Sequence, residues 1–393
     1  MKKSLLILLF TCWALFFAAF RPVMPFAAET AAFPDGTPVT GGRILMGTIG
    51  EPSNLIPYMA SDSASGEITG LLYVAPLKYD KDLNVVPWAA ASYEVLEGGR
   101  LLRFVLRDDI RWEDGVPLTA DDVEFTYKLM IDPKTPTAYS GDFLAIESFK
   151  KTGRLSFEVR YAKPFARSLM TWMGAILPKH VLEGQDIMTT PVARKPIGAG
   201  PYRLAKWDAG SMLTLTASDT YFEGRPNLDE VVYRIIPDPS TMFLELKAGK
   251  LDMMSLSPQQ YLRQTQGPQW ERDWRKYRYL SFSYTFLGFN LEHPFFKDVR
   301  VRRAISMAID RQSLIDGVLL GQGVPTVGPY KPGTWAYNDK LTPVRQDVDE
   351  ARRLLDEAGW KKDKDGLLER DGKPFLTSMP MRIAPACCNA LRG

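Results

Sequence analysis

The stretch 100–130 changes its hydrophobic period part-way along, and this limits the chain to a mixed fold. Its first part alternates, since Leu102, Phe104 and Leu106 are separated by Arg103 and Val105. A period of two is typical of a strand with one buried face. Its last part has the spacing of one helical face, with apolar residues at Val123, Tyr127 and Met130. Strand and helix periods this close together predict an α/β (mixed) protein.

A turn and a helix start join these two parts. Glu113, Asp114 and Gly115 form a turn signal, and Thr119 stands where a helix N-cap is expected. Two aspartates follow in the first helical turn, where the helix dipole favours anions. A glycosidase also uses two carboxylates, but the turn is the favoured interpretation of Glu113 and Asp114.

Other segments carry weaker forms of the same signals. Strands are expected at residues 42–50, 154–162, 251–254 and 280–290, and three more between 202 and 236. The segment 251–254 is expected beside Val231–Ile236 in one sheet. Helices are expected at residues 67–73, 241–247, 299–309 and 311–320. Gly198-Ala199-Gly200 lacks the third glycine of a nucleotide loop and predicts a tight backbone turn.

The helix expected at 299–309 has three arginines near its start. Its apolar residues recur at helical spacing, and Asp298 precedes them as an N-cap. Arg300, Arg302 and Arg303 flank that apolar face, where cations oppose the helix dipole. The favoured interpretation is that these arginines are solvated or paired with nearby carboxylates, and the alternative is an anion clamp.

The N-terminus has the pattern of an export signal. Lys2 and Lys3 precede an apolar run from Leu5 to Phe20, which is short for a membrane span. Residues 1–28 are therefore expected to be a signal peptide, with an uncleaved anchor helix as the alternative. Its removal takes away three of the 49 basic residues and leaves 46 of each sign. A near-neutral mature chain gives no reason to expect nucleic-acid binding.

Few residues suit metal binding or nucleophilic catalysis. The chain has two histidines, His180 and His293, and three cysteines. Cys12 lies in the expected signal, and Cys387 and Cys388 are adjacent near the end. No metal, no cofactor and no enzymatic activity are expected from this set. An exported hydrolase is the alternative, which the sequence does not favour.

Three ordered blocks resemble a known family. "FFKDVRVRRAISMAIDR", "FVLRDDIRWEDGVPLTADDVEFTYK" and "PIGAGPYRLAKWDAG" are similar to signatures of the family 5 extracellular solute-binding proteins, the oligopeptide- and dipeptide-binding components of ABC importers. Ala199 stands where the family usually has threonine. The segment "VDEARRLLDEAGW" also resembles the family's next helix. The resemblance runs from about Gly42 to Trp360.

The resemblance implies a two-lobed periplasmic binding protein-like fold, class II type, with an extra sub-domain and a peptide held between the lobes. The implied domains are a first lobe in three segments, 29–72, 73–195 (the extra sub-domain) and 196–285, and a second lobe, 286–393. The implied function is periplasmic peptide capture for an ABC transporter permease, by a monomer. A nickel chelate, haem or a sugar is the alternative ligand on the same scaffold.

The resemblance also implies ligand-lining residues on the first lobe. Ser61, Asp62 and Ser63 match a lining loop, with an ordinary solvated turn as the alternative. Tyr139 matches a tyrosine that reaches the ligand, with a half-buried surface tyrosine as the alternative. The strand that pairs with the peptide is matched by Met254, Ser255 and Leu256, where the alternative is sheet core.

Tyr284 is a further candidate, on the strand expected at 280–290. Its neighbour Phe286 is expected to pack in the core. Full family members continue well past residue 393, so the second lobe is expected to be incomplete. The segment 376–393 does not resemble the family, and a frameshift or early stop is expected there. The alternative function is therefore a truncated fragment that does not bind.

Overall fold

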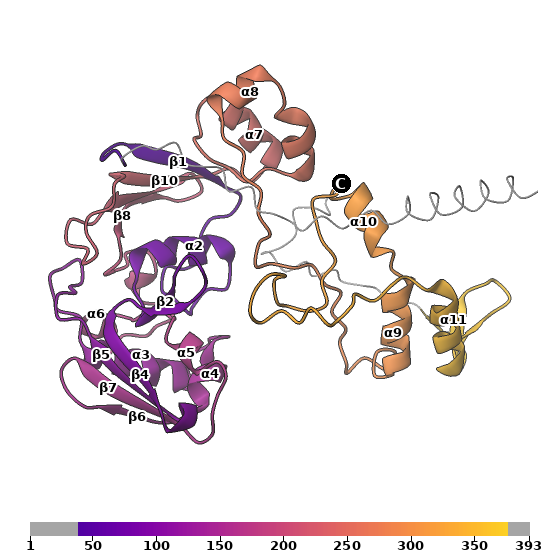
Figure 1. Ribbon diagram of the computed structural model, residues 1–393, viewed down its shortest axis with the longest axis horizontal. Helices are drawn as coiled ribbons and strands as arrows, with labels where there is room; N and C mark the ends of the chain where they lie inside the picture. Colours follow the sequence, from indigo (N-terminus) through magenta and orange to yellow (C-terminus); the bar gives the residue numbers. More distant parts are fainter. Residues whose placement is uncertain (1–37, 376–393) are drawn as a thin grey trace, which may run out of the picture. The chain divides into compact units, whose positions relative to one another are not determined.

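The computed structural model describes residues 38–375, which divide into two compact units at Ser257 and Pro258. Residues 38–257 are called the N-terminal unit and residues 258–375 the C-terminal unit. The expected export signal and the Cys387–Cys388 pair lie outside the described residues. Both units mix helices and strands (Figure 1).

One sheet of the N-terminal unit has the strand order β1-β10-β9-β8. β1 pairs in parallel with β10, and the other pairs are antiparallel. The strands are β1 Arg43–Thr48, β8 Tyr202–Asp208, β9 Met212–Ala217 and β10 Glu230–Ile235. The three strands expected between 202 and 236 are confirmed.

The segment 251–254 lies on the other side of β1 from where it was expected. Met253 forms a parallel bridge with Met46 of β1, so β1 separates this segment from β10. The chain reaches the bridge from β10 through helix α7, Pro239–Lys247. A crossover between parallel strands can pass over a neighbouring strand, and local pattern does not show which neighbour results. The predicted pairing of 251–254 with Val231–Ile236 is wrong.

A second, antiparallel sheet has the order β4-β5-β7-β6. Its strands are β4 Ala90–Leu96, β5 Leu101–Leu106, β6 Ile146–Lys151 and β7 Ser156–Tyr161. Helix α3, Ala120–Ile131, packs against β6. Thr119 caps α3 in a capping box with Asp122, which confirms the predicted strand, turn and helix in 100–130.

Aromatic rings from this sheet pack against one another and against Trp172. The ring centroids of Phe104 and Phe157 lie 4.8 Å apart, and those of Phe157 and Trp172 lie 5.3 Å apart. Phe149 stacks on the other side of Phe157 at 5.3 Å. Such pairs add to the stability that burial of apolar area provides.

Shorter elements complete the N-terminal unit. Helix α2 packs against β8 and lies between the two sheets in Figure 1. Strands β2 and β3 form a hairpin. The bounds are α2 Ser63–Leu72, β2 Leu77–Tyr79, β3 Val85–Pro87, α4 Ser140–Leu144, α5 Ser168–Thr171 and α6 Lys179–Leu182.

The C-terminal unit is built around a small core. Trp360 is fully buried, and its ring meets Phe295 at 4.9 Å and Phe375 at 4.7 Å. Helices α9 and α11 pack against each other. The elements are α8 Pro268–Asp273, α9 Val299–Ala308, α10 Arg311–Gly317, α11 Val348–Glu357, β11 Lys361–Lys362, β12 Leu368–Arg370 and β13 Lys373–Pro374.

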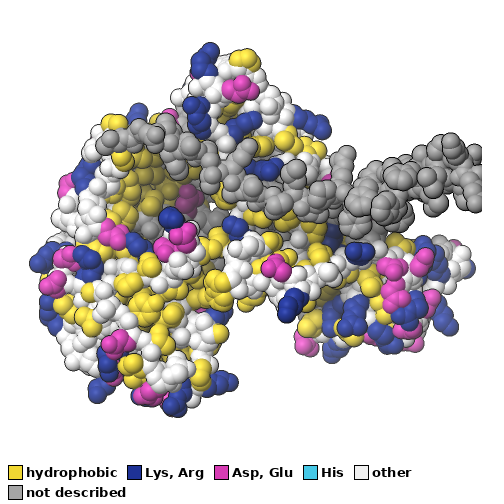
Figure 2. All heavy atoms as spheres, in the orientation of Figure 1, with side chains coloured by type: hydrophobic (Ala, Val, Ile, Leu, Met, Phe, Trp, Pro, Cys, Tyr) yellow, Lys and Arg dark blue, Asp and Glu magenta, His cyan; other side chains and the backbone are white. Residues whose placement is uncertain are grey.

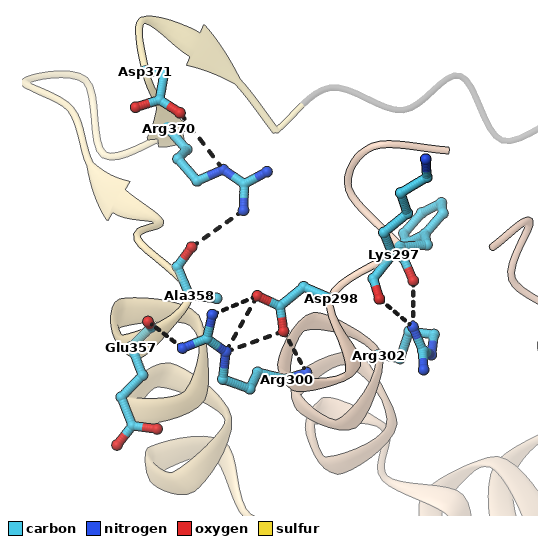
Figure 3. A network of polar contacts seen from close by, with 9 residues as sticks. Lys297, Asp298, Arg300, Arg302, Glu357, Ala358, Arg370 and Asp371 are labelled. Carbon is cyan, nitrogen blue, oxygen red and sulfur yellow. Dashed lines mark hydrogen bonds and ion pairs between the residues drawn. The ribbon is translucent and has the colours of Figure 1, made fainter. Parts of the chain in front are cut away.

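The start of α9 resolves the question of its arginines. Asp298 caps α9, and the Arg300 guanidinium forms an ion pair with it at 2.6 Å while donating to the carbonyl of Glu357 (Figure 3). Arg302 donates to the carbonyl oxygens of Phe296 and Lys297. Arg300 is thus held by the chain's own acceptors and ties α9 to the end of α11. The predicted pairing is confirmed for Arg300.

The strand expected at 280–290 does not form. The segment is irregular, and no described residue pairs with it in a ladder. An extended segment becomes a strand only through a hydrogen-bonded neighbour. Phe286 is 67% exposed, so its predicted core position is also wrong.

Charges of both signs mix over the helices of the C-terminal unit (Figure 2). On α11, Arg353 pairs with Glu350 and Glu357, and Arg352 pairs with Asp349. Such exposed pairs contribute little each to stability. Of the helices between residues 38 and 375, none has the length and apolarity that crossing a membrane requires.

Candidate ligand-binding site

The loop that leads into α2 is fixed by one carboxylate. Asp62 caps α2 by accepting hydrogen bonds from the Ser65 amide and hydroxyl, each at 2.8 Å. It also accepts from the Ser53 hydroxyl at 2.5 Å. Partial burial raises the pKa of Asp62, but these hydrogen bonds outweigh it and the net pKa is lowered. The carboxylate therefore stays ionised and holds the loop closed against residue 53.

Tyr139 lies beside this loop. Its hydroxyl is 3.5 Å from the carbonyl oxygen of Ala60, and its ring stands edge-on to Tyr58 at 6.1 Å. The side chain is 46% exposed. The structure thus brings Tyr139 together with the loop of Ser61, Asp62 and Ser63. An exposed ring with a hydroxyl suits contact with a partly polar ligand.

Met254, Ser255 and Leu256 continue from the edge of the first sheet. Met253 exchanges main-chain hydrogen bonds with β1, through Leu45 and Gly47, each at 3.2 Å. Beyond it, within residues 38–375, no hydrogen bond reaches the main chain of 254–256. Open N–H and C=O groups next to a sheet edge can accept an added strand. No hydrogen bond joins 254–256 to Tyr139 or the loop 61–63.

Tyr284 belongs to the C-terminal unit. It is 37% exposed, and its ring lies 5.3 Å from that of Phe286. Its segment has no strand pairing, so the hinge strand on which it was expected is absent from the described residues. The role of Tyr284 as a ligand residue stays a prediction.

Sequence reasoning missed Tyr58, which directly precedes the loop that contains Ala60 and Asp62 and whose ring contacts Tyr139. The Tyr58 hydroxyl donates to the carbonyl of Ala175 at 2.8 Å. The Thr137 hydroxyl donates to the main-chain carbonyl of Tyr58, also at 2.8 Å. Burial raises the pKa of Tyr58, so the hydroxyl stays protonated and able to donate. No pattern around Tyr58 signals this, because its partners lie far along the chain.

The two histidines have structural partners. His180 Nε2 lies 2.7 Å from Asp114 Oδ2, and the His293 ring packs on Phe295 and Phe296. Within the described part of the chain, no group of three His, Cys, Asp or Glu residues is placed to hold a metal ion.

Comparison with known proteins identifies the family. The model of the "Bacterial extracellular solute-binding proteins, family 5 Middle" matches residues 84–383. The chain belongs to this family. The recognition made from the three sequence blocks is confirmed, as is the expected α/β solute-binding fold. Membership places the chain among extracellular solute-binding proteins rather than in an enzyme family.

Individual proteins and solved structures that this chain resembles support the family assignment. The oligopeptide-binding protein AppA of Bacillus subtilis is 33% identical over 349 residues, which cover 86% of this chain and 64% of AppA. AppA's structure in complex with a nonapeptide has a TM-score of 0.77 at 32% identity, covering 86% of this chain and 68% of that one. NikZ from Campylobacter jejuni in complex with Ni(L-His) has a TM-score of 0.74 at 28% identity, covering 84% and 66%.

The chain spans less than two thirds of the length of such curated relatives. The share is 64% for AppA and 62% for protein XP55 of Streptomyces lividans.

Proposed function

We propose that this chain is the peptide-binding component of an ABC importer and that it takes peptides by their main chain. The observation that carries the proposal is the family match together with the resemblance to AppA, an oligopeptide-binding protein. Family 5 members with other ligands share the fold, so the choice of peptide rests on this resemblance.

The geometry of the N-terminal unit supports a main-chain mode of binding. Among residues 38–375, the main-chain groups of Met254, Ser255 and Leu256 find no hydrogen-bond partner beyond the Met253 bridge. Main-chain hydrogen bonds are common to all peptides, so an added strand binds with little dependence on side chains. The capped loop at Asp62 and the exposed ring of Tyr139 supply polar and aromatic contacts on the same unit.

Export and partners follow from the same proposal. Residues 1–28 act as a signal peptide, the mature chain works in the periplasm as a monomer, and an inner-membrane ABC permease receives the peptide. On the family resemblance, the first lobe ends at residue 285, the second lobe begins at residue 286, and the peptide is captured between the lobes. Ser61, Ser63 and Tyr284 are included as ligand-lining residues on the family resemblance alone.

A thermal-shift titration of the purified chain tests the proposal. The probe is a pool of random-sequence nonapeptides, with Ni²⁺ plus L-histidine as the competing ligand class. A ligand that binds only the native state must raise stability, by about 2.7 kcal/mol at a hundredfold excess over Kd. We expect peptide to raise the melting temperature and the nickel chelate to leave it unchanged. The opposite pattern would assign the chelate as ligand, and no response to either would favour a non-binding fragment.

Two variants at one position test the main-chain mode. Ser255→Pro removes a main-chain N–H, whereas Ser255→Ala removes only the side-chain hydroxyl. We expect the proline variant to weaken peptide binding by about tenfold or more, the loss expected for one or two hydrogen bonds. The alanine variant should bind within about twofold of wild type. Equal losses in both variants would contradict binding through the main chain.

A further inference from the structure

Tyr58 has a backbone conformation that its side chain disfavours. Its φ is +72°, in the left-handed region that is uncommon for bulky non-glycine residues. Such a conformation persists only where its surroundings fix it, and it is found most often where geometry matters for function. Tyr58 directly precedes the segment that runs through Ala60 to the Asp62 cap.

Contacts with four residues far along the chain hold Tyr58 in place. The Tyr58 hydroxyl donates to the Ala175 carbonyl at 2.8 Å, and the Thr137 hydroxyl donates to the Tyr58 carbonyl at 2.8 Å. Its ring also meets Tyr139 and Phe143 edge-on, at 6.1 and 6.0 Å. Both the side chain and the main chain of this residue are therefore anchored.

Gly174 provides the space for the Tyr58 hydroxyl. A Cβ built on Gly174 would lie 2.2 Å from that oxygen and 3.1 Å from the ring carbon that bears it. Gly174 is outside the left-handed region, so its backbone does not require glycine. The absence of a side chain at 174 therefore matters for the seating of Tyr58.

We propose that Tyr58 is a positioning residue: seated against Gly174 and Ala175, it fixes the direction of the loop 59–63 and so places that loop beside Tyr139. The inference rests on the proposed peptide function for what the loop does. The part of the inference that concerns the conformation of the loop depends only on the contacts of Tyr58. The conformation of Tyr58 sets the direction of the residues that follow it. In those residues the Ala60 carbonyl accepts a hydrogen bond from the Tyr139 hydroxyl, and Asp62 caps α2.

Two substitutions disturb the seat from opposite sides. Tyr58→Phe removes the hydroxyl and keeps the ring, whereas Gly174→Ala pushes on the hydroxyl without touching the loop. The double variant removes the closest clash, so its effect should be smaller than the sum of the single effects. Tyr93→Phe is a matched control, because it also removes a hydroxyl that donates to a main-chain carbonyl, that of Val85. Gly70→Ala is the control for Gly174, since nothing lies within 4 Å of its added Cβ.

The measurements are amide hydrogen exchange of residues 59–63 and the concentration of the nonapeptide pool that gives half-maximal heat in a calorimetric titration. Both are made at one temperature well below the melting temperature of each variant, where the folded state dominates in every variant. We expect Tyr58→Phe and Gly174→Ala to raise loop exchange about tenfold and to weaken peptide binding about tenfold. Both controls should stay within about twofold of wild type.

The outcomes separate this inference from the proposed function. Unchanged loop exchange in both single variants would overturn the positioning role, and so would faster exchange with unchanged peptide binding. If the wild-type chain binds no peptide while the variants still loosen the loop, the proposed function fails and the conformational role of Tyr58 is supported.

Discussion

The carbonyl oxygen of Leu72 occupies the space where a side chain on Gly198 would begin. A Cβ built on Gly198 would lie 2.0 Å from that oxygen, and Gly200 donates its amide to the same oxygen at 2.8 Å. The predicted tight turn at 198–200 is thus a close approach of backbone to the end of α2. The turn, which directly precedes β8, is thereby hydrogen-bonded to the last residue of α2.

Gly198→Ala should therefore destabilise the N-terminal unit strongly. The obstacle is main chain that cannot rotate away, so the loss should reach the upper part of the range for overpacking, about 3 kcal/mol. Denaturant unfolding measures it. Gly141→Ala in α4 is the control, because nothing lies within 4 Å of its added Cβ and alanine favours a helix. Equal stability of the two variants would contradict the close approach.

Glu113 should make stability depend on pH. Burial, the largest cause, raises the pKa of Glu113 to about 7, although the Gly198 amide and Arg203 lower it. An acid whose folded pKa exceeds its unfolded value of 4.5 stabilises the fold fully below pH 4.5. That contribution is lost as the pH rises through 7.

Glu113→Gln removes this titration and keeps a hydrogen-bond acceptor for the Gly198 amide. We expect wild type and variant to be equally stable near pH 4.5, and the variant to be about 1 kcal/mol more stable at pH 8. This is well below the full free energy of the pKa shift, because the carboxyl is partly exposed. Urea unfolding at both pH values measures the difference. A constant difference across this range would show that Glu113 does not titrate as expected.

Local patterns predicted those parts of the fold whose causes are local. The alternation at β5, the Thr119 cap of α3 and the Asp298 cap of α9 all depend on neighbours within a few residues. The strand expected at 280–290 failed because a strand needs a partner, and the partner is not written in the segment itself. The neighbour of segment 251–254 was predicted wrongly for the same reason, because Met253 pairs with Met46 of β1 and this partner is far away in the sequence.

The candidate site also has both local and distant causes. For Ser61, Asp62 and Ser63 the alternative was an ordinary solvated turn, and a helix was expected only from residue 67. In the structure α2 begins at Ser63 and Asp62 is its N-cap, a local signal that was missed. The position of Tyr139 came from family resemblance, and its contact with Ala60 needs two segments far apart in the chain. The left-handed conformation of Tyr58 could not be predicted, because its hydrogen-bond partners Thr137 and Ala175 are far away in the sequence.

Asp62→Ala should lower the stability of the N-terminal unit by about 1 kcal/mol, the typical loss of an N-cap. Because the pKa of Asp62 is lowered in the folded state, its contribution is present above the usual value of 3.8 and is lost as the pH falls through the lowered pKa. The difference between wild type and variant should therefore shrink in acid. Asp62→Ser keeps a capping oxygen and should lose less. A serine variant as unstable as the alanine variant would contradict capping as the source of the loss.

Trp360→Ala should unfold the C-terminal unit while sparing the N-terminal one. Trp360 is the largest side chain of a small core, where it meets Phe295 and Phe375 and carries the Arg370 guanidinium over its ring at 4.8 Å. Large-to-small changes of this kind cost about 3–5 kcal/mol, which is comparable to what so small a core supplies. Amide exchange in α11 should therefore rise to near the unprotected rate, while exchange in β9 and β10 should stay within about threefold of wild type. If β9 and β10 lost protection to the same extent, the two units would unfold as one cooperative body, and the small core around Trp360 would have to stabilise both.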